Sequence, residues 1–221
     1  SGNSGLMMVG SGASTGGRGG SIAITVGSGT SGAGGYMRLE SGRSTDVTGG
    51  AVTLESGEGT KSTSGSVKIR SQNSGTAGAS GMLVFSSGTA KAGNSGFVMI
   101  GSGASTGGRG GSVAITVGSG ESGVGGYMRL ESGLSSTVTG GAVTVESGEG
   151  TTTTSGSVKI RSQNAGTTGA SGMLVFSSGT ASSGNSGLMM VGSGASTGGR
   201  GGSIAITVGS GTSGAGGYMR L

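Results

Sequence analysis

Residues 49–72 have the sequence GGAVTLESGEGTKSTSGSVKIRSQ, and this stretch decides which fold the chain is predicted to adopt. A glycine precedes each of two short runs in which apolar and polar residues alternate. The second and fourth residues after each glycine are apolar, namely Val52, Leu54, Val67 and Ile69. Side chains of an extended strand alternate between two faces, so each run predicts a strand with one apolar face.

The same phrase recurs along the whole chain with a period of about 15 residues. The glycines that begin the first seven phrases are Gly5, Gly20, Gly35, Gly50, Gly65, Gly81 and Gly96. Five of the six steps between them are equal, and the remaining step is longer by a single residue that lies between 72 and 80. A Gly- and Ser-rich chain without a period is typical of disorder, whereas a phase kept over fifteen runs predicts an ordered repeat protein.

A longer period organises the chain into superrepeats, because six of the short steps together span 91 residues. Residues 92–182 match residues 1–91 at 75 of 91 positions, and residues 183–221 repeat residues 1–39 without a change. We therefore expect one continuous repetitive segment over 1–221, with superrepeats 1–91, 92–182 and 183–221, the last one partial.

Together the two periods predict an all-β fold, a parallel β-solenoid with six coils of about 15 residues in each superrepeat. One short strand cannot bury its apolar face alone, but stacked coils can bury a continuous one. We expect a thin two-layer cross-section with large aliphatic residues on one sheet and close-packed small residues on the other. The predicted core residues are Ile22, Ile24, Val52, Leu54, Val67, Ile69, Leu83 and Phe85.

The opposite face of the predicted strands carries recurrent apolar residues that favour a role in self-association. Contiguous apolar residues on a protein surface often mark an interface, although single exposed ones are common. The candidate lateral interface comprises Leu6, Met8, Met82, Val84, Phe97, Met99, Met173, Val175, Leu188 and Met190. Oppositely charged residues at equivalent positions of adjacent coils predict inter-coil ion pairs between Glu55 and Arg70 and between Glu146 and Arg161.

The composition argues against an enzyme. The chain has no histidine or cysteine and only eight acidic residues, so it offers no plausible pair of nucleophile and base and no metal-ligand set. Gly27, Gly29 and Gly32 form a GxGxxG pattern, but a further glycine-led run follows instead of the helix that a dinucleotide site needs. We expect no cofactor, no metal, no nucleic acid, since the basic residues are spread singly, and no membrane span.

Three phrases, GNSG at residues 2–5, GGSIAITVGSGTSGAGG at 19–35 and TSGSVKIRSQNSGTAGASG at 63–81, carry a resemblance. They resemble the long Gly/Ser/Thr-rich repeat proteins of diatoms and related marine microalgae. The resemblance covers the whole chain and implies a secreted or cell-surface protein, without implying any functional residue.

These observations lead to an expected function as a structural component of an extracellular or cell-surface filament. Its partner would be further copies of itself, joined end to end and laterally, with a surface polysaccharide or another matrix component as a further candidate. Two alternatives stay open at this point: an adhesin stalk, and an ice- or mineral-binding solenoid. The second is suggested by a partial column of threonines at Thr15, Thr30, Thr45, Thr60, Thr106 and Thr151.

Overall fold

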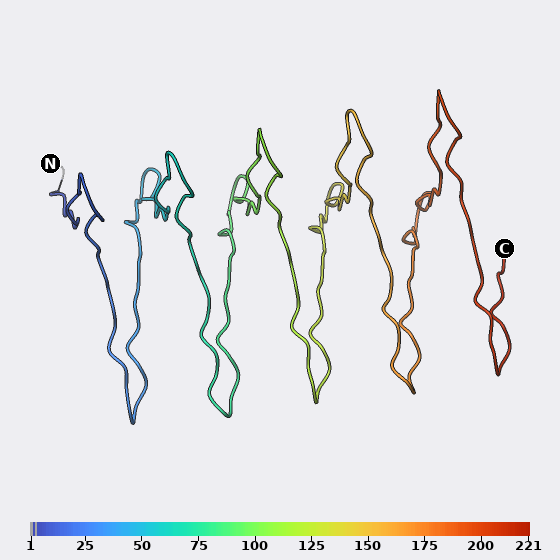
Figure 1. The fold of residues 1–221 in the computed structure, drawn as a ribbon, viewed down its shortest axis with the longest axis horizontal. Helices are drawn as coiled ribbons and strands as arrows, with labels where there is room; N and C mark the ends of the chain where they lie inside the picture. The colour runs from blue at the N-terminus through green and yellow to red at the C-terminus, as the bar shows by residue number, and fades with distance from the viewer. Residues whose placement is uncertain (1, 3) are drawn as a thin grey trace. The chain divides into compact units, whose positions relative to one another are not determined.

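A computed structural model describes residue 2 and residues 4–221 of the chain. Over these residues the backbone forms neither helix nor β-strand, and it consists of extended runs separated by short bends (Figure 1). The predicted parallel β-solenoid is therefore wrong, as are its all-β class and its thin two-layer cross-section. The described part of the chain is coil-like, and no sheet joins its successive repeats.

The short period nevertheless governs where the chain bends. In the first superrepeat the bends cover 15–17, 30–32, 45–47, 60–62, 76–78 and 91–93. The same spacing continues to the last bend at 212–214. The extra residue lies in the interval between the bends that start at 60 and 76. The bend at 76–78 follows Gly65 at a distance one residue longer than the distance from Gly50 to the bend at 60–62. The extra residue thus lies after the alternating run that starts at Gly65.

Most bends lie in a loop that two glycines close. The backbone N–H of Gly20 donates a hydrogen bond of 2.9 Å to the carbonyl oxygen of Gly12, and Gly65 donates one of 2.9 Å to Gly57. We call each such nine-residue segment, from the accepting to the donating glycine, a corner loop. Ten corner loops are closed in this way over the described residues. Every backbone–backbone hydrogen bond seen there belongs to one of them.

The closed corners show where the chain departs from the predicted solenoid. A two-layer coil with this period needs about half of its residues to run back alongside the first strand. In this chain the two ends of each corner loop lie side by side and are joined by a hydrogen bond, as between Gly12 and Gly20. The next extended run then starts in a new direction. The described chain therefore does not supply the second layer that the predicted fold required.

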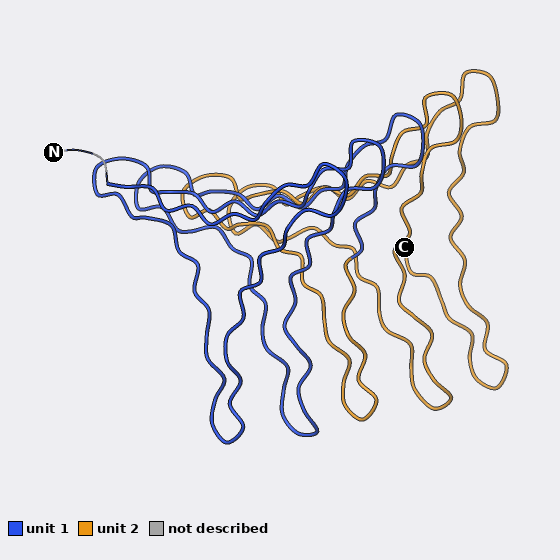
Figure 2. Ribbon diagram, turned by 60° about the vertical axis from the view of Figure 1, so that its left-hand side comes forward, with its two compact units in different colours: residues 1–114 blue, residues 115–221 orange. Residues whose placement is uncertain are grey.

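The chain divides into two compact units, residues 1–114 and residues 115–221 (Figure 2). Within the first unit the corners point in three directions in turn (Figure 1). The bends at 15–17, 60–62 and 106–108 share one direction, those at 30–32 and 76–78 share a second, and those at 45–47 and 91–93 share a third. This unit is thus a triangular coil in which three extended runs and three corners make one turn.

No described side chain is buried in the chain. The large apolar side chains all expose at least 45% of their surface, and the accessible area of the chain is 22063 Å². A compact folded protein of 20.4 kDa would expose about 8,800 Å², and its extended chain about 30,000 Å². The chain therefore hides only about a quarter of its extended surface, whereas a stable domain of this size hides about 70%.

Candidate self-association surface

Apolar residues of four successive alternating runs line one hollow in the first unit. In the first unit an open hollow is lined by Leu54, Val67, Ile69, Phe85, Val98, Met99, Ile100 and Gly101. Most of these side chains occupy the second or fourth position after the glycine of their run. Leu54 and Ile100 are separated in sequence by one turn of three corners. The hollow also contains Met99, which the alternation assigns to the opposite face, and no other layer of the described chain covers it.

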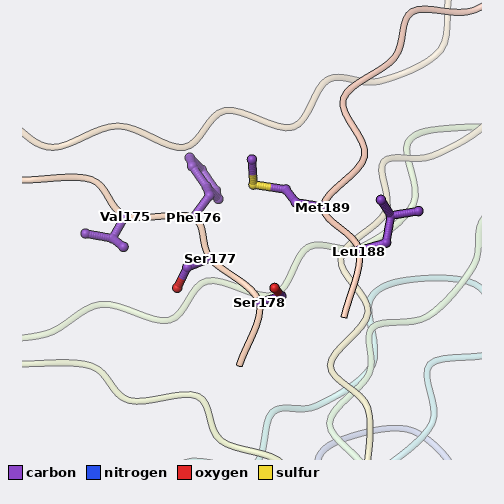
Figure 3. Close-up of a pocket in the computed structure, with 6 residues that line it drawn as sticks. All are labelled: Val175, Phe176, Ser177, Ser178, Leu188 and Met189. Atoms are coloured by element: carbon purple, nitrogen blue, oxygen red, sulfur yellow. The ribbon is translucent and has the colours of Figure 1, made fainter. Parts of the chain in front are cut away.

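A corner in the second unit shows the two faces at close range (Figure 3). Val175, Phe176, Ser177, Ser178, Leu188 and Met189 line a shallow hollow where two extended runs converge. The side chains of Phe176 and Met189 point toward one another inside this corner, whereas that of Leu188 points away (Figure 3). Phe176 and Met189 also line a second hollow with Met190 and Val191. Residues of both alternation faces thus line these hollows, since Val175, Leu188 and Met190 stand at the first or third position of their runs.

The predicted core residues lie on the less exposed of the two faces. Their exposed fractions range from 47% for Val67 to 74% for Ile24. The other six, which fall between these two, are Ile22, Val52, Leu54, Ile69, Leu83 and Phe85. They do not form a core within the chain, because nothing in the described residues closes the hollow that they line. Their burial in an assembly stays a prediction.

The predicted lateral residues are more exposed. Phe97 exposes 81% of its surface, and nine others expose between 62% and 86%: Leu6, Met8, Met82, Val84, Met99, Met173, Val175, Leu188 and Met190. The side chains are accessible for contact with a partner, as an interface requires. Met82 and Phe97 lie on successive runs that meet at the corner 91–93, and not in a stack. Whether they bind another copy stays a prediction.

The predicted inter-coil ion pairs do not form within the described chain. Glu55 and Arg70 belong to successive runs that diverge from the corner loop 57–65, and Glu146 and Arg161 are separated by the equivalent loop. Their failure to pair has the same cause as the failure of the solenoid. The ion pairs present over the described residues instead join positions two apart on one run: Arg38 with Glu40, and Arg129 with Glu131.

The corner loops hold hydroxyl and glycine residues in structural roles. The Ser14 hydroxyl oxygen accepts a hydrogen bond of 3.0 Å from the backbone N–H of Gly17, and Ser44 does the same for Val47 at 3.1 Å. The GxGxxG pattern at Gly27 lies in such a loop, where a Cβ on Gly29 would stand 2.4 Å from the Gly32 carbonyl oxygen. Gly29 of this pattern thus serves the close approach of the backbone to itself.

The threonine column lies at the first residue of successive bends, and those bends point in three directions within the first unit (Figure 1). Thr15, Thr30 and Thr45 thus stand on three different corners. A flat threonine array on one sheet, which ice binding would need, is not formed by the residues described. This arrangement gives no support to the ice-binding alternative.

Sequence reasoning missed the closure of the corners, although its signal is present. The paired glycines lie at a fixed spacing, as in Gly42 and Gly50 or Gly148 and Gly156. The Gly50 position needs the absence of a side chain, since a Cβ there would lie 3.3 Å from both the Gly42 nitrogen and the Ser41 Cβ. A glycine pair at this spacing around a polar segment indicates a closed loop instead of a returning strand.

Among the described residues, no three His, Cys, Asp or Glu side chains gather in a way that could hold a metal ion. That part of the chain also contains no helix long and apolar enough to cross a membrane. Comparison with protein-family models, curated proteins and solved structures finds no match to this chain.

Proposed function

We propose that this chain is a structural component of an extracellular or cell-surface filament, and that it works by associating with further copies of itself. The observation that carries the proposal is the exposed area of 22063 Å², about 2.5 times that of a compact protein of the same mass. Apolar surface left in water is unfavourable at about 25 cal/mol per Å², so an assembly that covers it is strongly favoured.

The repetitive sequence makes the chain its own best partner. A surface that returns with every superrepeat offers the same inner hollow and the same outer apolar residues to each copy. Copies can therefore match over any whole number of superrepeats, as a filament subunit requires. The extracellular setting is supported by the resemblance of the Gly/Ser/Thr-rich phrases to microalgal repeat proteins.

The test is assembly of the purified 221-residue chain in dilute buffer. We expect sedimentation velocity to show species larger than one chain, and negative-stain microscopy to show filaments that thicken with concentration. A chain that sediments as a 20.4 kDa monomer at every concentration up to hundreds of micromolar would refute the proposal.

A further inference from the structure

The extended runs of the coil have backbone groups without partners. Over the described residues, every backbone–backbone hydrogen bond joins the two glycines that close a corner loop. The runs 51–56 and 66–71 therefore pair with nothing above or below them. Backbone N–H and C=O groups are paired in the great majority of native structures once they leave water. The unpaired backbone groups of these runs are thus suited to pairing with other extended chains.

The three-sided symmetry of the coil indicates how many copies can intertwine with one another. In the first unit its corners follow one another at the short period and return to the same direction every third corner (Figures 1 and 2). The coil of the first unit therefore makes one turn in three steps of 15 or 16 residues each. A rotation that moves each corner to the next brings a second copy onto the same three sides, displaced along the axis by one third of a turn. Repeating the rotation adds a third copy and closes the set.

We propose that three parallel copies of this chain intertwine around a common three-fold axis, each filling the gaps between the turns of the other two. Closed rotational symmetry is the rule for homo-oligomers. A two-fold axis along the coil would set sides against corners, so that neither the backbone groups nor the apolar runs would match. Three chains give each extended run a neighbour on both edges.

The proposal gives a specific register between chains. At each level, the same run of all three chains forms one closed triangle, so the three copies of an inner residue such as Ile69 face the axis together. Along each side, the run that follows in sequence comes from the next chain. Glu55 of one chain therefore lies beside Arg70 of another. The pairing that one chain cannot make is made between chains.

This register also places the outer apolar residues in contact. Met82 and Val84 of one chain lie beside Phe97 and Met99 of its neighbour, since these occupy equivalent positions of successive runs. Within one chain the same residues lie on successive sides of the turn. The single-chain solenoid thus stays excluded, because every neighbouring run belongs to a different molecule.

The inference rests on the proposed function, since it specifies the number and register of the self-associating copies. It is tested with disulfides, for which the chain is suited because it contains no cysteine. The variant with Glu55→Cys and Arg70→Cys is assembled, oxidised and analysed on denaturing gels without reductant. We expect a covalent species of three times the 20.4 kDa chain mass, because each Cys at 70 reaches the Cys at 55 of the next chain until the ring closes.

The matched control carries Glu40→Cys and Arg70→Cys, which occupy equivalent positions two runs apart. Those residues would be separated by two chain spacings, about 9.6 Å, which exceeds the Cα separation that a disulfide spans. The control is expected to remain at the mass of one chain. A mixture of the two single variants at 55 and 70 should give cross-linked dimers, whereas each single variant alone should give none.

Other outcomes overturn the inference in distinguishable ways. Filaments that form without a 55–70 cross-link, or with covalent dimers or an open ladder in place of the trimer, leave the proposed function standing and exclude the three-chain register. Cross-linking within one chain at 55 and 70 would also exclude it. A monomer at all concentrations excludes both proposals.

Discussion

Replacing Ile69 with Asp tests the inner face at its most informative position. Ile69 lines the hollow of the first unit and exposes 52% of its surface in the single chain. Full burial of an isoleucine contributes about 2 kcal/mol, so covering the exposed half contributes about 1 kcal/mol for each chain. Three copies that meet at the axis lose about 3 kcal/mol from this term alone.

The introduced carboxylate adds a larger cost. Burying a charged carboxylate without a partner is unfavourable enough that the group prefers to take up a proton. Three of them in one layer would also repel one another. We therefore expect Ile69→Asp to reduce assembly at pH 7 by several orders of magnitude in the dissociation constant, measured by sedimentation equilibrium.

The pH dependence separates charge from lost packing. Burial raises the pKa of an aspartic acid, so the assembled form of the variant binds more protons than the free chain. Its assembly should strengthen as the pH falls, until the free chain is also protonated below pH about 4. The control is Ser66→Asp at the first position of the same run, on the opposite face of the alternation, which should leave assembly unchanged. Equal assembly of both variants at pH 7 would show that Ile69 does not face a buried interior.

Three further substitutions probe other parts of the chain. Replacing Phe97 and Met99 with Ser should weaken the three-chain unit only through the lost contacts with Met82 and Val84, and should also weaken bundling of filaments in micrographs. Unchanged bundles would show that these residues are not a lateral interface. Gly59→Ala should lower the stability of the assembly by about 1–3 kcal/mol in thermal melts, because its Cβ would lie 2.5 Å from the Thr63 carbonyl oxygen. Gly57→Ala, with open space around the added Cβ, should have no such effect, and equal melting of the two would contradict the argument. Arg38→Ala should change stability by less than about 1 kcal/mol in the same melts, since the Arg38 and Glu40 side chains are 69% and 62% exposed; a larger loss would show that the pair is buried by assembly.

The sequence predicted the local features of the structure better than its long-range order. The short repeat step, the extra residue near the fifth bend and the shared face of Val67 and Ile69 follow from the pattern of glycines and apolar residues. All three depend only on neighbours in sequence. Alternation fixes which way a side chain faces, and a glycine allows a close approach, whatever lies above or below the run.

The sequence did not predict which run lies beside a given run. The pattern around Leu54 states that its face is apolar, but it does not state whether the covering layer comes from the same chain. The predicted solenoid assumed that each coil returns directly over the one before it. The chain instead closes a loop from Gly57 to Gly65, and this glycine pair appears in the sequence as ordinary turn composition.

The two sequence periods acquire a physical meaning once several chains are considered. The short period sets one side and one corner, and three of these make a turn. The superrepeat equals two turns, with the single extra residue absorbed once in six corners. Repeating the surface after two whole turns adds no contact within a single chain. It adds contacts between copies that match side to side, because a partner shifted by one superrepeat meets the same apolar residues and the same charges. The long period therefore indicates that the repeated residues serve contacts between molecules more than the fold of one molecule.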